Sequence, residues 1–296
     1  MASQDKLEQT RPSGHGRARG LVSRPSGPGV RARFYRAPED LREMVERFWV
    51  GEWDLPAEAP HETQLLGDPC AHVVFERGDH TGEPERRLVG VWTKLWRRRL
   101  EGRGRVRAAK LRAGAFGALF AGAAARFSDR IVPLDDALDG ALDIALEDDV
   151  ALAAELDALQ AVVLDADDDE PAFVALAQWL RARRRTDRRE HVSLAVALVE
   201  RIASDHEIRS VQRLGEASGL DPRSLQRLFR EHVGASPKWV IRRSRLQEAA
   251  ARIERGEAPN LAQLAAALGY SDQAHLARDF KTAVGRSPSA FRRQGG

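Results

Sequence analysis

The chain contains very little sulfur and has no long apolar run. Its 296 residues include one cysteine, Cys70, and two methionines. One cysteine excludes an internal disulfide and any zinc site built from several cysteines, and we interpret Cys70 as a small buried apolar residue rather than a reactive thiol. No apolar stretch reaches the roughly 18 residues of a membrane-spanning helix. The first residues lack the apolar middle of a secretory signal, so we expect a cytoplasmic protein.

The net charge is also small, at +3, but it is unevenly distributed. Residues 134–170 contain fourteen Asp and Glu and no Lys or Arg. Residues 190–296 contain seventeen Lys and Arg against twelve Asp and Glu, a net charge of +5. The acidic stretch is typical of solvated helix faces and does not predict a metal site. The basic C-terminal part favours a polyanion such as double-stranded DNA as its partner.

Composition and pattern divide the chain into four parts. Residues 1–32 are rich in Gly, Pro, Ser and Arg and predict a disordered tail. Residues 33–134 predict a β-rich domain, residues 135–189 a helical acidic linker region, and residues 190–296 an all-α domain. The chain therefore belongs to the α+β class, with separate β-rich and helical parts.

Within the β-rich part, alternating or continuous apolar runs predict strands at 72–76, 87–96 and 106–111. A short helix is expected from Pro38, because Leu41, Val45 and Phe48 follow at helical spacing.

Leucines recur at three- and four-residue steps through 138–163 and predict an amphipathic helical face. This face either packs on its own domain or forms the seam of a homodimer, and we favour the dimer.

An internal repeat dominates the last hundred residues. The apolar pattern of residues 225–229 recurs at 276–280, an offset of 51 residues, and Val-Gly and Ser-Pro pairs follow both copies. Each copy predicts two helices joined by a turn. Gly219 and Gly269 end the first helices, because glycine tolerates positive φ. Asp221 and Ser271 are the expected N-caps of the second helices.

The second helix of such a unit can lie in the major groove and present its exposed residues to base edges. Arg pairs with guanine and Gln with adenine, whereas contacts to phosphates set the register. The expected base-contacting residues are Arg223, Gln226, Arg227, Gln273, His275 and Arg278. The expected phosphate-contacting residues are Arg230, Lys238, Arg242, Arg243 and Lys281.

A single long helix is predicted between the two units, over 236–256. About 18 helical residues span roughly 27 Å. This length suits two recognition helices set about one turn of DNA apart, roughly 34 Å.

Residues 190–293 resemble the AraC-type transcription regulators of bacteria. The similarity is carried by the stretches SGLDPRSLQRLFREHVGASPKWVIRRSRLQEAA and LAQLAAALGYSDQAHLARDFKTAVGRSPSAFRR. The resemblance implies two helix-turn-helix units joined by a rigid helix. Ala274 and Ala277 depart from it, because polar residues are common at those positions; this weakens base reading by the second unit in favour of phosphate contacts.

The N-terminal part more weakly resembles a domain found ahead of such units in a subgroup whose ligands are uncharacterised. The similarity rests on FYRAPEDLREMVERFWVGEW, GDPCAHVVFE and AGAFGALFAGAAARFSDRIVPLDDAL. It implies an effector-sensing or dimerising domain built as a degenerate β-barrel. The expected partners are thus double-stranded DNA, RNA polymerase, an unknown small-molecule effector and a second copy of the chain.

Two other classes of function are weighed against a DNA-binding regulator. An enzyme would need a nucleophile elbow, a phosphate-cradling loop or metal-ligand spacing, and the chain shows none of these motifs. The one group reminiscent of a barrel metal site, His61, His72, Glu76 and His80, matches no such spacing. An architectural or protein-binding module would make degenerate DNA contacts. We therefore expect a sequence-specific regulator with no catalytic residues, no cofactor and no metal.

Overall fold

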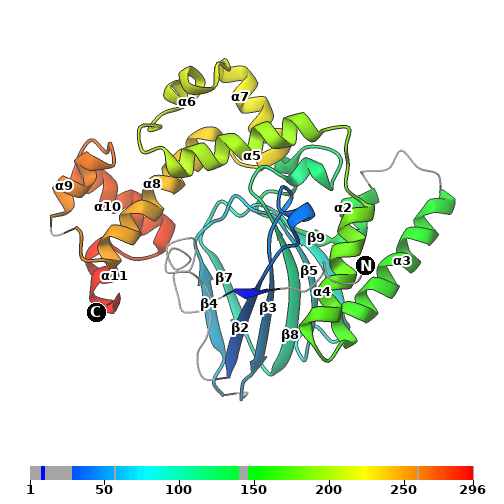
Figure 1. The fold of residues 1–296 in the computed structure, drawn as a ribbon. Coiled ribbons are helices and arrows are strands. Elements are labelled where there is room, and N and C mark those ends of the chain that lie inside the picture. The colour runs from blue at the N-terminus through cyan, green and yellow to red at the C-terminus, as the bar shows by residue number, and fades with distance from the viewer. Residues whose placement is uncertain (1–7, 11–28, 57, 140–145, 259, 296) are drawn as a thin grey trace.

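The computed structural model describes residues 8–10, 29–56, 58–139, 146–258 and 260–295. A curved sheet forms the centre of the molecule, with helices along one side and two further groups of helices above it and to its left (Figure 1). Most of the predicted disordered tail lies outside the described residues, but Gln9–Thr10 form strand β1 and pair with Tyr35 and Phe34. None of the described helices is both long and apolar enough to cross a membrane.

The central sheet is antiparallel and has seven strands in the order β1-β2-β3-β8-β5-β6-β9. A separate antiparallel pair, β4 with β7, packs through Leu100 into a small core on one face of the sheet. The strands are β2 (Val30–Arg36), β3 (Val45–Asp54), β4 (His61–Leu65), β5 (His72–Gly78), β6 (Glu85–Val89), β7 (Trp96–Leu100), β8 (Arg103–Leu111) and β9 (Ile131–Pro133).

Two sequence expectations are corrected in this region. The predicted strand at 87–96 is two strands, because residues 90–95 leave the sheet as a loop between β6 and β7. The helix predicted from Pro38 is one 3-10 turn, Glu39–Leu41, followed by β3. A β-bulge between Val45 and Arg47 lets Val45 and Phe48 both lie buried three residues apart, which imitates helical spacing.

The helices after the sheet form a layer of the N-terminal domain. They are α2 (Leu134–Asp139), α3 (Leu146–Asp165) and α4 (Asp169–Ala182). The leucine face of α3 packs in one core with Phe48 and Phe75 of the sheet and Phe173 of α4. The apolar face offered above as a dimer seam is thus occupied within its own domain.

A buried ion pair joins this helical layer to the sheet. Arg107 of β8 is fully buried and lies 3.0 Å from Asp169, at the start of α4, while its guanidinium also donates to the carbonyls of Val163 and Ala166. Burial alone would raise the pKa of Asp169. Hydrogen bonds from Arg33, Tyr35 and Arg107 outweigh burial and hold that pKa below its ordinary value.

The remaining helices build the C-terminal part. They are α5 (Arg189–Ser204), α6 (Val211–Ser218), α7 (Pro222–Leu228) with a π-helical turn (Phe229–Val233), α8 (Pro237–Glu254), α9 (Leu261–Ala267), α10 (Gln273–Val284) and α11 (Pro288–Gly295). Two separate apolar cores lie along α8. Val240 and Ile241 belong to the core of the first unit, whereas Leu246 and Ile253 belong to that of the second.

Candidate DNA interface

The first helix-turn-helix unit consists of α6, a glycine turn and α7. Gly219 ends α6 in the left-handed conformation, with φ of 70°. The Asp221 carboxylate then accepts the N–H groups of Arg223 and Ser224 at 2.9 and 3.1 Å, and Pro222 occupies the first turn of α7. These are the stop and start predicted from the sequence, and they fix the angle between the two helices.

The second unit, α9 and α10, repeats this construction with one difference. Gly269 has φ of 70°, as Gly219 does. The N-cap of α10 is Asp272, whose carboxylate accepts the His275 N–H at 2.7 Å, and not Ser271 as predicted. The Ser271 hydroxyl instead lies 3.1 Å from Nδ1 of the His275 ring. An aspartate cap puts a negative charge at the helix start, where the backbone dipole favours it.

The six predicted base-contacting residues all lie on exposed faces of the second helices. Leu225, Leu228 and Phe229 turn inward on α7 and its π-helical turn, while Leu276 and Phe280 do so on α10. Arg223, Gln226, Arg227, Gln273, His275 and Arg278 are exposed on the opposite sides. Each second helix therefore packs its apolar side on the core of its own unit and exposes a polar side that could enter a groove of DNA.

The predicted phosphate contacts separate into two groups. Arg230, Lys238 and Lys281 are exposed. Arg242 lies 2.8 Å from Asp279 and so ties α8 to the second recognition helix. Arg243 is buried, at 9% exposure, and donates to the carbonyl of Gly67 in the N-terminal domain. Arg243 therefore faces the N-terminal domain and not the surface where DNA would lie.

The turn before α10 is held to α8 by an aromatic contact. The Arg245 guanidinium lies 3.9 Å from the centre of the Tyr270 ring. The His275 ring meets the same tyrosine edge-on, with 5.1 Å between ring centres. Burial raises the pKa of Tyr270 to about 12, so its hydroxyl stays protonated at neutral pH. The position of His275 thus depends on the packing between α8 and the second unit.

The histidines and the glutamate weighed as metal ligands do not form a ligand set. Glu76 is fully buried and bound by Arg87, Arg98 and His80. Nδ1 of His72 accepts the Trp49 indole N–H at 3.1 Å. Within the described residues no three His, Cys, Asp or Glu side chains gather as a metal site would require.

The single cysteine lies in the interior of the N-terminal domain. Cys70 is buried, and its thiol lies 3.6 Å from the Glu46 carboxylate. Burial raises the pKa of this thiol well above its ordinary value. A neutral buried thiol is a poor nucleophile, which agrees with the structural interpretation of Cys70.

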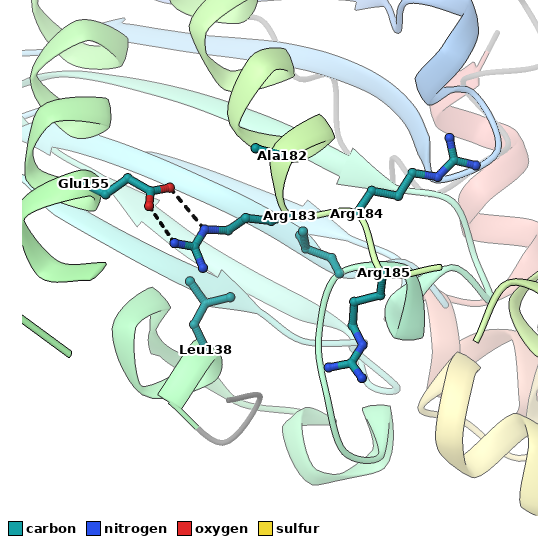
Figure 2. Close-up of a pocket in the computed structure, with 7 residues that line it drawn as sticks. Leu138, Glu155, Ala182, Arg183, Arg184 and Arg185 are labelled. Atoms are coloured by element: carbon teal, nitrogen blue, oxygen red, sulfur yellow. Dashed lines mark hydrogen bonds and ion pairs between the residues drawn. The ribbon is translucent and has the colours of Figure 1, made fainter. Parts of the chain in front are cut away.

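A groove of about 420 Å³ opens where the connection to the C-terminal part begins. Leu119 and Leu138 line it together with residues 182–185. Arg183 points to Glu155 and forms a two-pronged ion pair with it, at 3.1 and 2.7 Å, whereas Arg184 points away (Figure 2). Arg184 and Arg185 are paired with Glu43 and Asp187. The arginines of this groove are therefore already matched by carboxylates.

Two helix-turn-helix units joined by one long helix make up the C-terminal part, and the comparisons with known proteins agree with this assignment. Residues 214–294 match a family model described as a helix-turn-helix domain. Residues 33–133 match one described as a domain of unknown function, DUF6597. Residues 214–294 are therefore similar to helix-turn-helix domains, and residues 33–133 are similar to the domain of unknown function.

Named transcriptional regulators match part of the chain. An uncharacterised HTH-type transcriptional regulator of Haemophilus influenzae is 30% identical over 107 residues, which cover 36% of this chain and 34% of that protein. The HTH-type transcriptional activator RhaS of Pectobacterium atrosepticum is 31% identical over 27% of this chain and 29% of its own. The XylDLEGF operon transcriptional activator of Pseudomonas putida is 32% identical over 29% and 27%. The chain thus spans about a third or less of these relatives.

The solved structures of ToxT from Vibrio cholerae resemble the chain over a greater length but more weakly. One at 1.65 Å resolution has 10% identity and a TM-score of 0.35, over 90% of this chain and 98% of that one. A likeness of this size says nothing about function.

Proposed function

We propose that this protein is a sequence-specific DNA-binding transcription regulator that reads two adjacent segments of the major groove. The observation that carries the proposal is the pair of capped second helices, α7 and α10, each with an apolar side in its own core and an exposed polar side. The six exposed residues named above are the proposed base contacts. Arg230, Lys238 and Lys281 are the proposed phosphate contacts. Arg242 is proposed to position α10 through its ion pair with Asp279.

Selection of bound sequences from a random duplex pool tests this function, with the full chain at near-physiological salt. The expected result is a two-part motif whose halves lie about one helical turn apart. One short motif would mean that only the first unit reads bases. Binding without enrichment, and with a strong salt dependence, would contradict sequence-specific recognition, because contacts to phosphates alone carry no sequence information.

The N-terminal domain is the proposed regulatory part. We take residues 33–134 with the helices of 135–189 as one effector-responsive unit and residues 190–296 as the DNA-binding unit, working in the cytoplasm and acting on RNA polymerase. The common core of the sheet, α3 and α4 supports the effector-responsive unit, and Val192 and Val196 of α5 join that core from the other side of the boundary. A homodimer would use a surface other than the leucine face of α3, which is already buried.

A ligand screen by thermal unfolding tests the regulatory role. A small molecule that raises the melting temperature of the full chain and also changes its affinity for the selected duplex is the expected effector. A compound that stabilises the chain and leaves DNA affinity unchanged would bind without regulating.

A further inference from the structure

Two loops of the N-terminal domain lie against both helix-turn-helix units. We call residues 66–68 and 90–95 the bracing loops. Val91 is buried in the core of the first unit, whereas Leu66 and Leu95 pack with the core of the second. The residues that α8 contributes to the two cores come from opposite ends of that helix. The bracing loops therefore give these units a second physical connection, besides α8.

The bracing loops meet the two units at equivalent positions of the repeat. Gly234 and Gly285 follow the two recognition helices, and both have positive φ, of 82° and 80°. A Cβ on Gly234 would lie 3.2 Å from Val91, and one on Gly285 would lie 2.9 Å from Leu95. The turn that ends each recognition helix thus rests on its own bracing residue, four positions apart in one loop.

The helix between the units is held by polar contacts from the same loops. The Trp239 indole N–H donates to the carbonyl of Thr93 at 3.1 Å. Arg243 donates to the carbonyl of Gly67, and its other nitrogen lies 3.5 Å from the Asp68 carboxylate. Asp68 is paired in turn with buried Lys110 of β8, at 2.7 Å. Helix α8 is thus anchored through buried charges to the central sheet.

The bracing loops are themselves rigidly supported. Asp129, with φ of 56°, accepts the backbone N–H and the hydroxyl of Thr93 at 2.7 and 2.6 Å. The backbone N–H of Trp92 donates to the carbonyl of Asp68 and so joins the two loops. Gly90 has no room for a side chain, because a Cβ there would lie 1.8 Å from the carbonyl oxygen of Phe127. Loops held on this many sides transmit the position of the sheet to whatever rests on them.

We propose that the bracing loops hold the two recognition helices at one fixed separation, so that the N-terminal domain sets the spacing between the two DNA segments that the chain reads. This inference rests on the proposed function. A single helix between two units leaves them free to tilt as it bends. Contacts to both units and to the helix between them remove that freedom, and two linked sites bind together only where their spacing fits.

The test compares full-length variants on duplexes that carry both selected half-sites at the native spacing, or one base pair closer, or one or two farther apart. The double variant Leu95→Ala with Trp239→Phe removes the apolar contact to the second unit and the hydrogen bond to α8. Lys94→Ala, an exposed position in the same loop, is the matched control. Dissociation constants are measured for each duplex and for a duplex with the first half-site alone.

The wild type and Lys94→Ala are expected to lose about tenfold in affinity for each base pair away from the native spacing, and the double variant less than about threefold. Affinity for the single half-site should not change. A double variant with the same narrow optimum, or a wild type without one, would overturn the proposal and leave the spacing to α8. Failure of the wild type to bind even the single half-site would instead contradict the proposed function. If the double variant does not fold, Trp239→Phe alone, which keeps an aromatic ring, decides in the same way.

Discussion

The two helix-turn-helix units arise from one sequence repeat, yet they lie in different surroundings. The first is built against the N-terminal domain. Its π-helical turn contacts the 3-10 turns Phe116–Ala118 and Ala124–Phe127, and the preceding α5 places Val192 and Val196 in the core of the sheet. The second unit meets that domain through Leu66 and Leu95. Similar local sequence therefore builds similar units, while the neighbouring domain makes one of them the more firmly supported.

The recognition helices differ in the same direction. α7 exposes Arg223, Gln226 and Arg227 within five residues. On α10 the exposed polar residues are separated by Ala274 and Ala277. Alanine can contact a thymine methyl group but makes no hydrogen bond to a base edge. We therefore expect the first unit to contribute more of the sequence preference than the second.

The largest expected effect is a loss of stability that should be greater near the N-terminal domain than in the second unit. Asp169→Asn removes the carboxylate that pairs with fully buried Arg107, and we expect the free energy of unfolding of the N-terminal domain to fall by about 3–5 kcal/mol. Because α5 shares that core, hydrogen exchange should accelerate in the sheet and α5 before it does in α9 and α10. Asp168→Asn, at an exposed neighbour, is the control. Equal acceleration in α5 and in α9 and α10 would contradict the difference in support.

The next largest effect is a difference between the units in how much DNA affinity one arginine contributes. Arg227→Ala should weaken binding to the selected site by about 1–3 kcal/mol and relax its sequence preference at one position. Arg278→Ala on the second unit should also relax the preference at one position but cost less, because the neighbouring Ala277 adds no hydrogen bond to a base edge. Dissociation constants on matched and mismatched duplexes measure both. A sequence-specific loss of equal size for Arg278→Ala would contradict the difference between the units, and an equal loss on every sequence would assign Arg278 to phosphate contacts.

The smallest effect is a dependence of the first unit's stability on pH through His232. His232 is buried, at 2% exposure, and a Cβ on Gly117 of the N-terminal domain would lie 2.4 Å from its Nδ1. Glu231, Arg188 and His191 are the charged or titratable groups that act on it. Burial, with a smaller contribution from Arg188, holds the pKa of His232 below its ordinary value.

Because the folded chain resists protonating His232, its contribution to stability is present above the ordinary histidine pKa, near 6.5, and is lost as the pH falls below it. We expect the protection of amides in the first unit, corrected for the intrinsic exchange rate at each pH, to fall as the pH drops below about 6.5, and His232→Gln to reduce that change. Ala283 occupies the equivalent position of the repeat and cannot titrate, so the second unit has no counterpart of His232. The same loss of protection in the His232→Gln variant would assign the effect to another group.

The features predicted from the sequence are those that depend on neighbouring residues. Gly219 with its positive φ, the Asp221 cap and the long helix α8 all follow from local backbone chemistry, and all are found as predicted. The strands at 72–76 and 106–111 are found for a similar reason, because β-branched and apolar runs favour a buried pleated surface. Where two local signals competed, as at Ser271 and Asp272, the residue that the backbone geometry selected was one position away.

The features that only the tertiary structure decided depend on residues far apart in the chain. The bulge in β3 turned an apparent helical spacing into a strand, because pairing with β2 and β8 outweighs local preference. Packing of α3 on the sheet, rather than on a second copy, depends on where the sheet lies. Arg243 appears in the sequence as one more basic residue on an exposed helix. In the structure it donates to the carbonyl of Gly67, 176 positions away in the chain. Such contacts are formed only when the whole chain has folded, so no local pattern encodes them.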